Sequence, residues 1–269
     1  MREWFNKYFT VVKMTWIQTL EYKANAVVGT FAIFSGLGIE YLIWKQVFFS
    51  QNLTEIRGFT FYELMAYIFL CMIVGQLKSS WATSLEMIES IRTGELNKYL
   101  IRPISFFTYH FMIFIGHNSL FYIVYITILI LFPIVLPGWA FQTTFQIIGF
   151  ILALIISIYL SYTIYFCMVC FAFWFGEVRS LIVAYNVSNI ILSGQIIPLR
   201  LFPDIIREFI YLTPLQFLVD FPVSIATGSV SYDLWLQKML FALFWCVIIT
   251  VIGRVSYRFG VRVYEGFGA

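Results

Sequence analysis

Few side chains in the apolar stretches of this sequence are of the kinds that do chemistry. Glu40 is the one acid well inside a predicted span, and Asn186, Asn189 and Ser193 are spaced three and four residues apart, on one face of a helix. Such groups are costly in lipid and usually face a cavity or a partner helix. We therefore expect them to line a polar pathway or a dimer interface. The alternatives are helix–helix hydrogen bonds for the stripe and, for Glu40, contact with outer water or a pair across helices.

Histidine and cysteine indicate neither a metal site nor redox chemistry. His110 and His117 are seven residues apart, too far along one helix to bind one metal together. Cys167 and Cys170 form a C-x-x-C pair, but it lies in an apolar run with no further Cys or His nearby. We expect satisfied polar contacts for the histidines and small buried hydrophobes for the cysteines.

Catalytic motifs are missing as well. The sequence has no H-E-x-x-H, no paired aspartates in its apolar runs and no G-x-x-x-x-G-K-[ST] phosphate loop. The first two absences argue against an intramembrane enzyme. The third means that any nucleotide chemistry must lie on another chain, so this polypeptide is expected to be no enzyme and to hold no cofactor or metal.

The composition indicates that the helices carrying these residues lie in a membrane. Of 269 residues, 61% are hydrophobic and 12% are charged, whereas soluble domains carry about 25% charged residues. Apolar runs long enough for a span of about 20 residues predict an all-α protein with six transmembrane helices. They lie at residues 24–44, 60–77, 105–133, 142–174, 180–197 and 234–253. The loop between the third and the fourth is "PIVLPG", where Pro133, Pro137 and Gly138 break helix.

Charge sets the predicted orientation. Six spans put both termini on one side, and a cytoplasmic position for them leaves 12 Lys and Arg inside and 5 outside. We expect a multi-pass protein of the plasma membrane with both termini in the cytoplasm. No polar stretch is long enough for a second domain, so residues 1–269 are read as one membrane domain.

Two further segments are predicted on the cytoplasmic side. Residues 2–22 place an aromatic face opposite a charged one, which is typical of a helix lying along the membrane surface. The alternative is a positively charged leader that only fixes the topology. Residues 84–102 form a short amphipathic helix and its loop, where Gly94 permits a C-cap and Pro103 starts the next helix. This helix is expected either to dock on another protein or to be an ordinary solvated loop. The residues of interest are Leu85, Glu86, Ile88, Glu89, Arg92 and Gly94.

The last unusual segment, residues 198–230, falls on the outer side. It contains Pro198, Pro203 and Pro214, and its apolar runs are too short to cross a bilayer. Pro203 and Asp204 are typical of a helix start. We expect two short helices that dip into the outer leaflet as a re-entrant hairpin at the outer end of a pathway.

The order of these elements resembles the type-2 ATP-binding-cassette exporter permeases. "IRTGELNKYLIRPI" (91–104) resembles the inner-loop signature of that family, and residues 193–222 resemble its outer re-entrant segment. The tail "RVYEGFGA" (262–269) is similar to the ending of one subgroup of bacterial permeases.

The resemblance implies a permease subunit that exports a hydrophobic or amphipathic substrate. Its partners would be a second permease subunit, as a homodimer or homologous heterodimer, and cytoplasmic ATPase subunits that bind ATP and Mg. The helix near 84–95 would be the coupling helix, and the N-terminal helix would brace it. The main alternative is a stand-alone secondary transporter or channel, although only one acid lies clearly in a span and no inverted repeat is evident.

Overall fold

The computed structural model describes residues 2–21, 23–50, 52–135 and 140–264, and these residues form helices joined by short connections. The prediction of an all-α protein is confirmed for this part of the chain. Helices satisfy their own backbone hydrogen bonds, which is what a lipid environment demands of a spanning segment. The predicted breakers Pro137 and Gly138, and the tail beyond Tyr264, lie outside the described residues, whereas helix continues through Pro133 to Val135.

The elements follow one another in short succession. The first half contains α1 (Arg2–Glu21), α2 (Lys23–Ser50), α3 (Phe61–Leu77), α4 (Trp81–Arg92), α5 (Asn97–Leu100), α6 (Phe106–His117) and α7 (Ser119–Val135). The second half contains α8 (Thr144–Cys170), α9 (Ala172–Phe175), α10 (Arg179–Leu192), the 3-10 turn η1 (Leu199–Leu201), α11 (Asp204–Leu212), the 3-10 turn η2 (Pro214–Leu218), α12 (Asp220–Ala226) and α13 (Tyr232–Val263).

Among the described residues, four stretches of helix are long and apolar enough to cross a membrane. They are Val27–Ser50, Phe61–Arg92, Thr144–Phe175 and Tyr232–Val263. The pair α6 and α7 adds a fifth if it is counted as one bent span. The protein is therefore a multi-pass membrane protein with four or five candidate spans, and the count of six stays a prediction.

The predicted span at 105–133 is broken in the middle. The axes of α6 and α7 differ by 54°, and the break is at Asn118, whose side-chain amide donates to the carbonyls of Phe114 and Ser79. These bonds cap the end of α6 and tie it to the α3–α4 junction. Pro103 does not start this helix: Ser105 does, as an N-cap whose hydroxyl accepts from the Thr108 amide.

The predicted span at 180–197 is only partly helical. Helix α10 has 14 residues, a length of about 21 Å, against about 30 Å for the hydrocarbon layer. The chain then turns at Gly194 (φ 81°), where an added Cβ would lie 3.1 Å from the Cβ of Asp220. The close approach of α12 therefore requires glycine at this turn.

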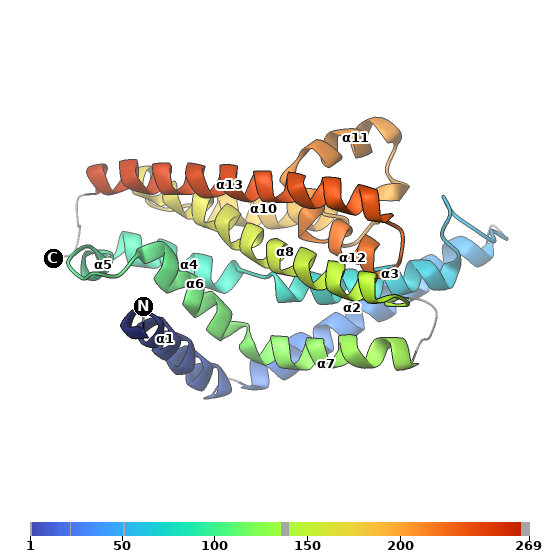
Figure 1. The fold of residues 1–269 in the computed structure, drawn as a ribbon, viewed down its shortest axis with the longest axis horizontal. Helices are drawn as coiled ribbons and strands as arrows, with labels where there is room; N and C mark the ends of the chain where they lie inside the picture. The colour runs from blue at the N-terminus through green and yellow to red at the C-terminus, as the bar shows by residue number, and fades with distance from the viewer. Residues whose placement is uncertain (1, 22, 51, 136–139, 265–269) are drawn as a thin grey trace.

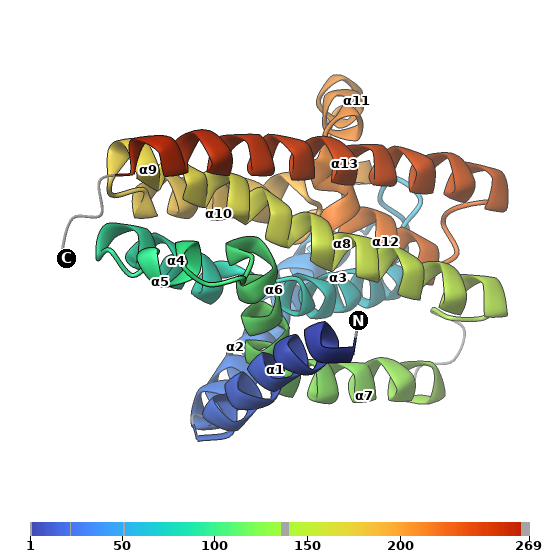
Figure 2. The same ribbon diagram turned by 60° about the vertical axis from the view of Figure 1, so that its left-hand side comes forward.

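Helices α8 and α13 run along the length of the molecule side by side (Figure 1), and α12 packs against α8 and α3. All seven residues of α12 are buried. Helix α11, in contrast, projects from the body in both views (Figure 2). One apolar cluster joins α3, α8, α12 and α13, and a second joins α4, α6, α8 and α10.

Helix α1 packs along α6 near one end of the molecule (Figure 1). Thr15 is buried in this contact, where an added Cβ on Gly116 would lie 2.7 Å from the Thr15 Cβ. The other side of α1 leaves Phe9 and Leu20 exposed. The predicted N-terminal helix is present, and its place at the membrane surface stays a prediction.

Candidate functional site

The charged end of α4 forms an ion-pair network with the start of α10. Arg92 lies 3.3 Å from Glu89 and 2.9 Å from Glu177, measured from guanidinium nitrogen to carboxylate oxygen. Arg179 lies 3.1 Å from Glu89 and 3.6 Å from Glu177. The side chains are 41–51% exposed, so each pair contributes at most about 1 kcal/mol. Glu89 and Arg92 were predicted as site residues, whereas Glu177 and Arg179 were not.

The apolar face of α4 is covered by other helices of the same chain, and docking of α4 on a partner stays a prediction. Ile88 is fully buried in the second apolar cluster, and Leu85 packs against that cluster. An isolated helix would expose this face, but α4 continues the line of α3 into the body of the protein and packs on α6, α8, α9 and α10. The charged side chains of Glu86, Glu89 and Arg92 are partly exposed on the other face and remain available to a partner.

The helix ends as its sequence predicts. Thr93 is the C-cap, and the following Gly94 has φ 83°, the left-handed conformation that glycine adopts without strain. Lys7 of α1 donates to the carbonyl of Pro103, at 2.8 Å, just beyond this turn. Helix α1 is thus tied to both α6 and the charged segment.

A polar cavity lies between α2, α3, α8 and α10. Its volume is about 500 Å³, within the range of small-molecule sites. Polar residues from three of these helices and from the connections after α3 and α10 contribute to its wall: Gln76, Lys78, Ser79, Ser161, Tyr165, Asn186, Asn189 and Gln195.

Two of the predicted pathway residues line this cavity. Asn186 accepts a short hydrogen bond from the hydroxyl of Tyr165. Asn189 is buried, and its side-chain oxygen has no partner among the described residues. Ser193 is buried one turn further on, but it is not part of the wall.

Glu40 is not brought into the cavity. Its carboxylate accepts from the indole nitrogen of Trp44 at 3.0 Å, on the same helix. Gly36, one turn earlier, does line the cavity, so Glu40 lies on the same face of α2 beyond it.

The segment 198–230 contains a buried carboxylate that sequence reasoning missed. Asp220 is 2% exposed and accepts from the hydroxyl of Tyr67 at 2.6 Å. Its backbone N–H donates to the Ser193 carbonyl at 3.0 Å. Burial raises the pKa of this carboxyl, and the Tyr67 hydrogen bond and the nearby charges of Lys238 and Arg200 act in the opposite direction. An acid set in the apolar run "LQFLVDF" was the available signal.

The three prolines singled out in this segment lie at helix starts. Pro198 precedes η1, Pro203 is the N-cap of α11 and Pro214 opens η2. The predicted helix start at Pro203 is confirmed. How deep the hairpin lies in a membrane stays a prediction.

The comparison of the whole chain with protein families decides what kind of membrane protein this is. The model of the ABC-2 family of transporter proteins matches residues 34–268. The chain belongs to this family. It is a type-2 ABC permease, the membrane component of an ABC transporter, and this membership implies association with a nucleotide-binding ATPase. No curated protein matches the sequence of the permease.

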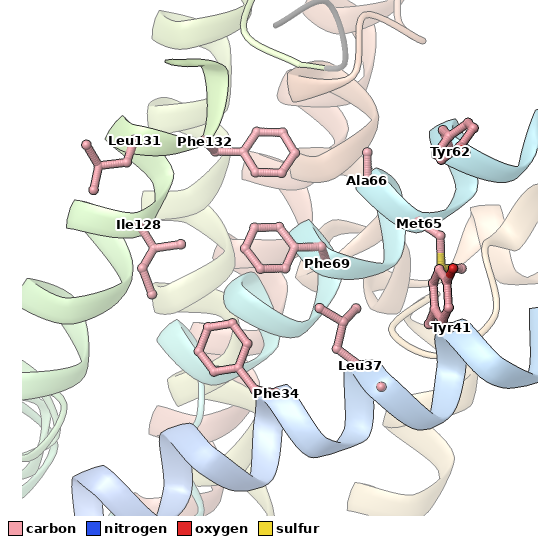
Figure 3. A pocket seen from close by; sticks show the side chains of 11 residues that line it. Phe34, Leu37, Tyr41, Tyr62, Met65, Ala66, Phe69, Ile128, Leu131 and Phe132 are labelled. Atoms are coloured by element: carbon pink, nitrogen blue, oxygen red, sulfur yellow. The ribbon is translucent and has the colours of Figure 1, made fainter. Parts of the chain in front are cut away.

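The permease also has an apolar pocket of about 800 Å³ between α2, α3 and α7, drawn in Figure 3. Phe34 and Leu37 enter it from α2, Phe69 from α3, and Ile128 and Phe132 from α7. None of the residues proposed above for a polar pathway takes part, and the pocket is separate from the polar cavity.

The histidines and cysteines of the permease have ordinary structural contacts. His110 is buried, with Nδ1 3.0 Å from the Phe106 carbonyl. His117 lies 3.7 Å from the carboxylate of Glu86. The thiols of Cys167 and Cys170 face carbonyls of α13. No group of three potential metal ligands occurs among the described residues.

Proposed function

We propose that this permease exports a hydrophobic or amphipathic substrate, driven by ATP hydrolysis on separate cytoplasmic ATPase subunits. ATP and Mg would bind only to those subunits, because the permease sequence has no phosphate loop. Two permease subunits, identical or homologous, would enclose the pathway. The exposed, largely apolar surface of α2 supports a role for that helix against lipid or a second subunit.

The observation that carries the proposal is the link between the polar cavity and the charged end of α4. Gln76 and Ser79 line the cavity, and Glu89 lies in the ion-pair network. The 13 positions from Gln76 to Glu89 lie along Phe61–Arg92, one candidate span, which corresponds to about 20 Å of helix. A force on the exposed carboxylate would therefore reach the cavity wall through a nearly continuous helix.

We propose that the permease lies in the plasma membrane with both termini in the cytoplasm. The charged end of α4 would then face the ATPase, and the hairpin from η1 to α12 would face outward. The last turns of α13, with Arg254, Arg258 and Arg262, would lie inside, as the distribution of basic residues favours. The four candidate spans and the bent pair α6–α7 make five crossings. A sixth would result if α10 and the hairpin together crossed the membrane once.

The test is a charge reversal at the network in the complete transporter. Glu89→Lys would remove both ion pairs of this carboxylate and place a cation beside Arg92 and Arg179. We expect normal insertion but loss of the stimulation of ATPase activity that depends on the permease. The matched control is Glu208→Lys, the same charge reversal at an exposed residue of α11, which is proposed to lie on the outer side. It should leave the stimulation of ATPase activity unchanged.

Copurification gives the independent check. The tagged permease, extracted in mild detergent, should retain a cytoplasmic ATPase, and the purified pair should transport only with ATP. Transport by the permease alone would contradict the proposal and favour a secondary transporter or channel.

A further inference from the structure

The polar cavity contains a buried cation for which the fold provides no counter-ion. Lys78 is 3% exposed and lines the cavity at the end of α3. Its backbone is fully used: the N–H donates to Val74 and Gln76, and the carbonyl accepts from Ser161 at 2.8 Å. No carboxylate of the described residues lies within ion-pair distance of its ammonium group, and no acid is part of the cavity wall.

An unpaired ammonium group in such a place is expensive. Transfer of a charge from water into a protein interior or a membrane costs several kcal/mol unless a partner is provided. Replacement of Lys78 by an apolar residue would remove this cost without loss of a described ion pair. The charge is therefore best explained by a ligand that neutralises it.

The neighbours of Lys78 are suited to the same ligand. The amides of Gln76 and Gln195 and the hydroxyl of Ser79 can donate to an anion. Asn189 also lines the cavity, and the nitrogen of its side-chain amide can donate to an anion as well.

The part of the cavity wall that α2 contributes is apolar. Gly29, Ala32 and Gly36 come from one face of α2, together with Ile33. Small side chains let an elongated apolar group approach the helix backbone closely. The cavity thus offers a cationic and amide side to a head group and an apolar side to a tail.

We infer that this cavity binds the anionic group, a phosphate or carboxylate, of an amphipathic molecule, with Lys78 as its counter-ion. The inference names the substrate class of the pathway and so rests on the proposed function. The same anionic chemistry occurs on a membrane lipid and on a detached single-chain amphiphile, and the test separates these two sources.

The test measures binding to the full-length permease without ATPase. The protein is placed in nanodiscs of phosphatidylcholine, and saturable binding of tritiated dodecyl phosphate is measured against empty nanodiscs. We expect Lys78→Gln to weaken binding by about tenfold or more, because a charge-assisted contact is lost, and Lys78→Arg to keep most of it. Lys45→Gln, the same change at an exposed lysine of α2, should have no effect.

A second variant guards against misfolding at position 78. Asn189→Asp keeps the shape of the side chain and adds a negative charge beside the site. The affinity for dodecyl phosphate should therefore fall, and the affinity for the cation dodecyltrimethylammonium should rise. Displacement by phosphatidic acid, but not by inorganic phosphate, would assign the site to a lipid head group. Displacement by dodecanoate but not by phosphatidic acid would assign it to single-chain amphiphiles.

Equal binding by the wild type and Lys78→Gln, or tighter binding of the cationic probe to the wild type, would overturn the inference. The outcome is separable from the proposed function. Anion binding without ATP-driven transport would support the inference and contradict the export function. Export of neutral amphiphiles without anion binding would support the export function and contradict the inference.

Discussion

The hydroxyl of Tyr67 in α3 donates to the carboxylate of Asp220 in α12 at 2.6 Å, across 153 positions of sequence. Both side chains are buried. The bond fixes α12 to the helix that leads, at its other end, to the charged residues of α4. Movement of α3 would therefore act on both ends of the permease.

Removal of the donor should loosen the contact between α3 and α12. Tyr67→Phe leaves a buried carboxylate short of one hydrogen bond, which should lower the free energy of unfolding by about 1–3 kcal/mol. Thermal unfolding in detergent measures the loss. Tyr232→Phe removes the same atom from a mostly exposed side chain and should change little; equal effects would show that the Tyr67 bond has no special weight.

The buried carboxyl should also make stability depend on pH. Because burial raises the pKa of Asp220, the folded protein holds this proton to a higher pH than the unfolded chain does. Its contribution to stability is complete below the unfolded pKa of about 3.9 and is lost as pH rises through the folded pKa.

Asp220→Asn removes this titration. The melting temperature of the wild type should therefore fall relative to that of the variant as the pH rises above the unfolded pKa of about 3.9. The exposed Asp233→Asn serves as the comparison and should follow the wild type. A difference between Asp220→Asn and the wild type that stays constant with pH would contradict the prediction.

The contact of α1 with α6 depends on Gly116. A Cβ at this position would lie 2.7 Å from Thr15 Cβ and 3.2 Å from the Val12 carbonyl. Gly116→Val should separate the two helices and cost about 1–3 kcal/mol, visible as faster proteolysis within α1. Gly38→Ala, where an added Cβ meets nothing within 4 Å, should be neutral or slightly stabilising.

The turn after α4 requires a left-handed residue. Gly94→Ala at φ 83° should cost about 1–2 kcal/mol in unfolding and reduce stimulation of the ATPase, since the turn orients the exposed end of α4. Gly58→Ala, at φ 81° in the loop between α2 and α3, should cost a similar amount of stability. If both variants reduce stimulation equally, the effect is one of stability and not of coupling.

Local signals in the sequence were enough for many of the elements. Long apolar runs predict membrane helices because any other backbone arrangement leaves polar groups unsatisfied in lipid. The helix start at Pro203 and the turn at Gly94 were also predicted, since both follow from the φ and hydrogen-bond limits of single residues. The stripe of Asn186 and Asn189 was found because its spacing is helical.

Tertiary packing decided the remaining features. Ile88 is fully buried only because α4 continues into the body of the protein, whereas the side chain of its neighbour Glu89 stays about half exposed. In the sequence, Lys78 is one of the basic residues that set the orientation, and Asp220 is an acid in the segment between two predicted spans. Their environments arise where helices distant in sequence meet, and no local pattern encodes which face of one helix another will cover.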